Sequence, residues 1–85
     1  MTPAQAEKTG TLLQGRLTDL LDLSLTLKHA HWNVVGAEFL PVHRLLDEWV
    51  AAVRTMTDDT AERIATLGGI PNGLPGQLAN PDPEN

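Results

Sequence analysis

Two pairs of metal-binding side chain types stand four residues apart in the second half of the chain. His43 and Asp47 form one pair, and Asp58 and Glu62 form the other. In an α-helix, residues four apart project about 40° from each other, so each pair could hold one metal ion from one face. His43 and Asp58 are separated by roughly 22 Å along a helix. One ion therefore cannot contact both pairs within a single straight helix.

Two antiparallel copies of such a helix would bring the pairs together. A two-fold axis near Ala52–Val53 would set each pair of one copy beside the other pair of its partner, which makes two equivalent sites per dimer. The spacing thus predicts a site shared between two copies of the chain.

Hydrophobic periodicity predicts the elements that must position these side chains. Along two long segments, apolar residues recur at steps of three and four, the spacing of one helix face. Gly36 can take the left-handed conformation after a helix, and Pro41 suits the first turn of the next one. We therefore expect an all-α fold, an antiparallel helical hairpin with helices near 8–34 and 39–67.

This hairpin would add His31, near the end of the first helix, to the site. The expected ligand set is then His31, His43 and Asp47 from one chain with Asp58 and Glu62 from its partner. Imidazole and carboxylate ligands without thiolate suit iron, zinc or manganese, and two nitrogens with several oxygens are compatible with redox-active iron.

Each of these side chains also has an ordinary structural interpretation. A histidine on a leucine-rich helix face is more often a hydrogen-bonded core residue than a ligand. Asp58 and Glu62 could equally belong to a solvated charged face, and Trp32 and Trp49 could be packing residues. Two histidines and three carboxylates that meet under one symmetry operation favour the metal site.

Composition narrows the classes of function. The 85 residues include no cysteine, which excludes disulfides and thiolate metal sites. A formal charge of −5 disfavours nonspecific binding to nucleic acid and suits cations as ligands. The chain has no apolar run near 18 residues and no cationic, hydrophobic leader, so we expect a soluble, cytoplasmic protein without a membrane partner. No nucleophile motif or phosphate-binding glycine loop is present.

The rest of the chain bears on folding and assembly. Residues 68–85 carry four of the six prolines and are predicted to be a loop or a disordered tail. The apolar arcs of the two helices are wider than one hairpin can cover. The isolated chain is therefore expected to self-associate or to be only marginally folded.

Three segments resemble the ferroxidase signature of the Dps family, the DNA-binding proteins from starved cells within the ferritin-like superfamily. They are "HAHWNVVG", "FLPVHRLLDEW" and "DDTAERIATLGGIPNG", and the resemblance spans residues 28–73. It implies that residues 1–85 form a partial ferritin-like domain, like the N-terminal half of a four-helix-bundle subunit. It also implies oxidation of ferrous iron by hydrogen peroxide, iron storage in a twelve-subunit shell, and protection against oxidative stress.

The resemblance assigns roles to single residues. It makes His31 and His43 the imidazole ligands and Asp47 a direct or water-mediated carboxylate ligand, while Asp58 and Glu62 come from the partner subunit, with Glu62 bridging. The resulting centre would hold one or two iron ions at the subunit interface.

Neighbouring positions match less specific features of the family. Trp32 and Trp49 match oxidisable aromatics beside the centre, Lys28 matches a residue that bonds a nearby carboxylate, and His29 matches no ligand position. The lysine-rich tails that some members use on DNA are absent, so DNA binding is not expected. The alternative function is a noncatalytic helical self-association module that retains the ligand residues.

Overall fold

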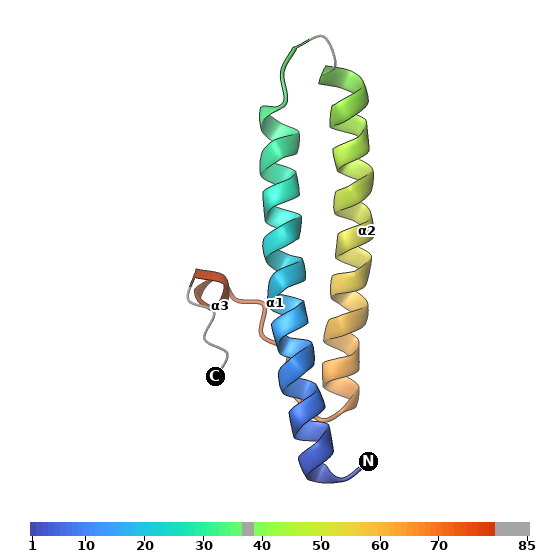
Figure 1. Cartoon of the computed structure of the whole chain (residues 1–85), viewed down its shortest axis with the longest axis vertical. Coiled ribbons are helices and arrows are strands. Elements are labelled where there is room, and N and C mark those ends of the chain that lie inside the picture. Colours follow the sequence, from blue (N-terminus) through green and yellow to red (C-terminus); the bar gives the residue numbers. More distant parts are fainter. Residues whose placement is uncertain (37–38, 80–85) are drawn as a thin grey trace.

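Two long antiparallel helices form the body of the computed structural model (Figure 1). The structure describes residues 1–36 and 39–79. Helix α1 spans Pro3–Asn33, helix α2 spans Phe39–Thr66, and a short helix α3 spans Pro75–Ala79. Within these residues there is no strand, and the predicted all-α hairpin is confirmed.

Helix α1 begins at Pro3, earlier than the expected start near residue 8, because its N-terminus is capped. The Thr2 hydroxyl accepts the N–H of Gln5 at 3.1 Å, and the Gln5 side-chain oxygen accepts the N–H of Thr2 at 2.8 Å. This reciprocal pair satisfies donors at the start of the helix, and Pro3 has no N–H to satisfy. The cap outweighs the low helix propensity of Gly10 and Gly15.

Helix α2 ends in a turn that requires glycine. The N–H of Gly68 donates to the carbonyl of Ala65 at 3.0 Å, and the N–H of Gly69 donates to the carbonyl of Ile64 at 3.0 Å. Gly68 has φ of +88°, which side chains rarely adopt, and a Cβ on Gly69 would lie 3.0 Å from the Ile64 side chain. Both glycines thus allow the two hydrogen bonds that end α2 and reverse the direction of the chain.

Helix α3 stands where the sequence predicted a loop. Pro75 suits its first position, and the side-chain oxygen of Asn72 accepts the N–H of Leu74 at 3.0 Å just before it. Figure 1 shows the chain after α2 folding back so that α3 lies beside α1. Pro75 therefore begins a short helix within a segment whose proline content had indicated only a loop. Residues 80–85 of the predicted tail lie outside the described residues.

The hairpin buries few apolar side chains between its two helices. The buried ones are Leu17 of α1 and Leu46, Val50, Val53 and Ile64 of α2. Many other large apolar side chains are at least 42% exposed, among them Leu12, Leu23, Leu25, Leu45, Trp49 and Met56. The wide apolar arcs are therefore only partly covered by the described residues, while self-association stays a prediction. None of the described helices is long and apolar enough to cross a membrane.

Replacing Leu17 with alanine tests this core. The side chain is 2% exposed, so Leu17→Ala should lower the free energy of unfolding by about 2–5 kcal/mol through lost burial and a residual cavity. The measurement is a denaturant titration followed by circular dichroism at fixed protein concentration. Leu12→Ala on the same helix is the matched control, because Leu12 is 67% exposed. Equal losses in both variants would contradict this packing.

Candidate metal centre

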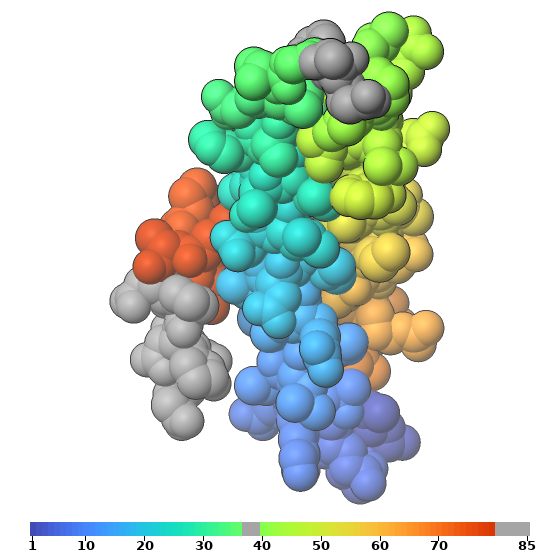
Figure 2. All heavy atoms as spheres, turned by 45° about the horizontal axis from the view of Figure 1, so that its top comes forward, coloured from blue at the N-terminus to red at the C-terminus, as the bar shows by residue number. Residues whose placement is uncertain are grey.

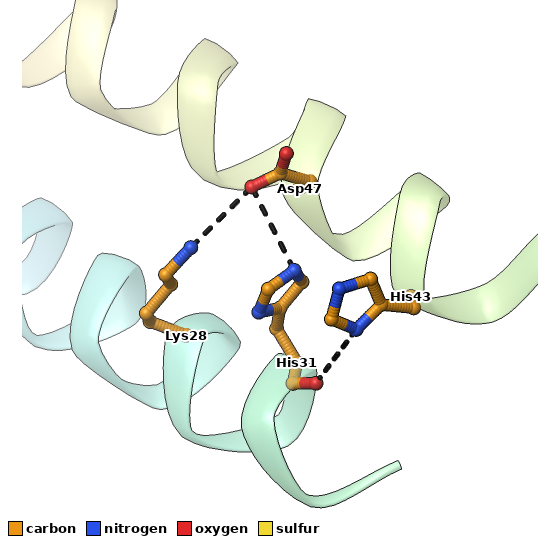
Figure 3. Close-up of polar contacts among 4 residues, drawn as sticks. All are labelled: Lys28, His31, His43 and Asp47. Carbon is orange, nitrogen blue, oxygen red and sulfur yellow. Dashed lines mark hydrogen bonds and ion pairs between the residues drawn. The ribbon is translucent and has the colours of Figure 1, made fainter. Parts of the chain in front are cut away.

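His31 and His43 face each other at the end of the hairpin that the turn between α1 and α2 closes (Figure 3). His31 lies in the last turn of α1 and is 8% exposed, while His43 lies near the start of α2. Their rings stack with centroids 3.6 Å apart and planes 27° from parallel. The hairpin turn therefore brings the two imidazoles together, as the sequence predicted.

A backbone atom orients the His43 ring. Its Nδ1 lies 3.1 Å from the carbonyl oxygen of His31 (Figure 3). A carbonyl oxygen can only accept a hydrogen bond, so in neutral His43 the proton sits on Nδ1 and the lone pair on Nε2. Such a bond to the second ring nitrogen is how proteins commonly fix a metal-binding histidine.

Asp47 stands beside this histidine pair. Its Oδ1 lies 3.8 Å from Nε2 of His31 and 3.4 Å from Nζ of Lys28. The Asp47 side chain is 63% exposed, so the ion pair with Lys28 adds little to stability. Asp47 Oδ1 thus lies between the Lys28 ammonium group and Nε2 of His31 (Figure 3).

The surroundings of His31 favour its neutral form. Burial lowers the pKa of His31, and the nearby His43 and Lys28 lower it further, against the opposing effect of Asp47. Its Nδ1 is buried and has no hydrogen-bond partner among the described residues. A neutral imidazole is suited to a metal ion, because metal ligands must be deprotonated.

The other predicted ligands lie elsewhere on α2. Asp58 and Glu62 are exposed, and Asp58 borders a hollow of about 470 Å³ between α1, α2 and α3. Among the described residues of one chain, no group of three or more histidine and acidic side chains could hold a metal ion. The hairpin brings His31, His43 and Asp47 together without Asp58 and Glu62. A site shared with a second copy stays a prediction.

The remaining residues near the site fall into two groups. Trp32 and Trp49 are 68% and 49% exposed, so within this chain they are not core packing residues. Lys28 bonds a carboxylate, as the resemblance implied, and His29 is exposed. The backbone carbonyl of His31 also belongs to the site, because it orients His43, and the spacing of side chains in the sequence could not reveal it.

Comparisons with known proteins agree with this fold. The family described as the ferritin-like domain matches residues 10–85. The "Fine tangled pili major subunit" of Haemophilus ducreyi is 53% identical over 78 residues, which is 92% of this chain and 41% of that protein. A "DNA protection during starvation protein" of Mycolicibacterium smegmatis is 49% identical over 78 residues, again 92% of this chain and 43% of that one.

Solved structures give the same result. The tetragonal form of Mycobacterium smegmatis Dps matches with a TM-score of 0.91 and 46% identity, over 96% of this chain and 50% of that one. DpsA14 from Streptomyces coelicolor matches with a TM-score of 0.84 and 54% identity, over 87% and 44%. The chain thus spans about half the length, or less, of these relatives.

The lowered pKa of His31 predicts how stability depends on pH in metal-free protein. Between that pKa and the ordinary value of 6.5, the unfolded chain binds more protons than the folded one, so stability should fall as pH falls through this range. His31→Gln should flatten that slope in denaturant titrations between about pH 7.5 and about pH 5. The same substitution at exposed His29 controls for loss of an imidazole. An unchanged slope in His31→Gln would show that His31 is not the titrating group.

Proposed function

Because this chain belongs to the ferritin-like family and resembles the N-terminal half of a Dps subunit, we propose that it provides ligands for a ferroxidase centre shared between two copies. The substrates are ferrous iron and hydrogen peroxide. Two ferrous ions each give one electron to one peroxide, whose O–O bond breaks to leave two hydroxide ions and two ferric ions. The outcome is sequestration of iron and removal of an oxidant.

The stacked pair of buried His31 and half-buried His43 carries this proposal. His31 is held neutral by burial and by its positive neighbours, and the bond from His43 Nδ1 to a backbone carbonyl puts the lone pair on its Nε2. Two imidazoles beside the carboxylate of Asp47, one of them oriented by a backbone carbonyl, suit a divalent transition metal. Zinc and manganese suit the same donors.

The oxygen ligands that complete the centre come from a second copy in this proposal. Asp58 and Glu62 are exposed on α2, where a second chain can reach them. Carboxylates favour iron as its charge rises from ferrous to ferric, because they balance the added positive charge. Glu62, in the proposed centre, bridges two ions or completes the shell of one.

The scale of assembly is a further part of the proposal. The chain spans 43% of its relative from Mycolicibacterium smegmatis. The Dps resemblance implies a twelve-subunit shell that stores ferric mineral, and this part of the proposal therefore concerns a full-length form. The acidic character of the chain, with a formal charge of −5, supports a cation as substrate and disfavours DNA as a partner.

Two observations favour a second candidate, a noncatalytic self-association module. Large apolar side chains such as Leu45 and Met56 are exposed, and one relative is named as a pilus subunit, a protein of assemblies. Such a module would retain the histidines without accelerating iron oxidation. The two candidates therefore differ in their effect on the rate of ferrous oxidation by peroxide.

Removing both imidazoles tests the centre. A variant with His31→Ala and His43→Ala lacks both nitrogen donors, so oxidation of ferrous iron by peroxide should fall towards the uncatalysed rate while helicity persists. Ferric absorbance measures the rate, and circular dichroism checks the fold. His29→Ala is the matched control, because His29 is exposed on the same helix. Unchanged kinetics in the folded double variant would remove these histidines from the centre.

Mixing two inactive variants tests whether the site is shared. One variant lacks the histidines His31 and His43, and the other lacks the carboxylates Asp58 and Glu62. In a mixed dimer, intact histidines of one chain face intact carboxylates of the other at one of the two sites, so activity should partly return. Ferric absorbance after subunit exchange measures the recovery.

Differently tagged chains provide the control by showing that mixed dimers form. If the ligands came from one folded-back chain, every chain in the mixture would still lack half of its site. Mixed dimers that stay as inactive as either parent would therefore overturn the shared centre.

A further inference from the structure

A glutamine on α1 binds the backbone of the connection between α2 and α3 at two points. The side-chain oxygen of Gln14 accepts the N–H of Asn72 at 2.9 Å, and its Nε2 donates to the carbonyl of Asn72 at 2.8 Å. These residues are 58 positions apart in sequence. We call this pair of hydrogen bonds the amide clamp. Gln14 Nε2 also lies 3.2 Å from the hydroxyl of buried Thr18, which helps to orient the amide.

The amide clamp determines where α3 lies. Directly after Asn72, the chain passes so close to α1 that a Cβ on Gly73 would lie 3.3 Å from the side chain of Leu21. The side chain of Asn72 accepts the N–H of Leu74 at 3.0 Å and contacts Gln77 at 3.4 Å, so it orders the start of α3. Figure 2 shows the red segment of α3 lying against the side of α1.

Helix α3 in this position forms one wall of the hollow beside Asp58. The hollow has a volume of about 470 Å³, and its lining includes Leu21 and Leu25 of α1, Arg54 and Asp58 of α2, and Pro75 and Leu78 of α3. Leu25 is 54% exposed. Asp58, a ligand of the proposed centre, thus lines a partly apolar hollow. The amide clamp holds α3, which forms the third wall of this hollow.

We propose that Gln14 is a positioning residue for the surface on which a second copy of this chain docks. This inference rests on the proposed function, because the second copy must bring its histidines to Asp58. A two-fold axis near Ala52–Val53 places position 58 opposite position 47 of the other copy. The hollow would therefore receive the Lys28–Asp47 pair of that copy, whose ammonium group complements the Asp58 carboxylate and whose carboxylate complements the Arg54 guanidinium.

The experiment compares two changes at Gln14 in the metal-free chain. Gln14→Leu removes both bonds of the clamp at similar volume, and Gln14→Glu keeps the acceptor while losing the donor. Amide hydrogen exchange at Asn72 should accelerate about tenfold in Gln14→Leu, with exchange at Val53 in the hairpin core unchanged. Sedimentation should show weaker self-association of this variant, and Gln14→Glu should lie between it and the parent.

Thr11→Ala is the matched control, because within residues 1–36 and 39–79 its hydroxyl donates only to the carbonyl of Glu7 in the same helix. Unchanged exchange at Asn72 in Gln14→Leu would overturn the clamp. Faster exchange with undiminished self-association would overturn its role in docking. Because neither measurement uses iron, a chain that shows both expected effects yet fails to oxidise ferrous ions would overturn the proposed function and leave the docking surface standing.

Discussion

The rise of a continuous α-helix is the constraint on which the rest of this arrangement depends. Helix α2 runs without a break from Phe39 to Thr66, so side chains near its two ends cannot reach one point. The hairpin turn solves half of this problem, because it adds His31 to His43 and Asp47 at one end. Asp58 and Glu62 stay apart from them within one chain, and in the proposed centre a second molecule brings the two groups together.

The two flanks of α2 carry different side chains, one acidic and one apolar, so they suit two different contacts. At 100° per residue, Asp47 and Asp58 project from one flank, and exposed Leu45, Trp49 and Met56 project from the opposite one. A partner that shares metal ligands and a partner that covers apolar surface therefore need not compete. The same helix can serve both contacts at once, with its buried face still turned to α1.

Local sequence patterns predicted the hairpin, while a local helix cap and one long-range contact account for the features that the prediction missed. Periodicity marked both long helices, and the turn between them put His31 beside His43. The early start of α1 depends on the reciprocal bonds of Thr2 and Gln5, which outweigh two weak helix formers. The position of α3 depends on Gln14, 58 residues away from its partner, and no local pattern contains that contact. Ring stacking and the backbone acceptor of His43 likewise follow from the packing of two helices.

The acceptor that orients His43 is the carbonyl of His31, which lies in the last turn of α1. Carbonyls in the last turn of a helix have no partner within it, so this one is used without the loss of a helical bond. Every amino acid supplies the same carbonyl. The acceptor for Nδ1 of His43 is therefore present whichever side chain occupies position 31, and its place depends on the path of the backbone. Changes in the length of the turn between α1 and α2 would disturb it more than most substitutions around it.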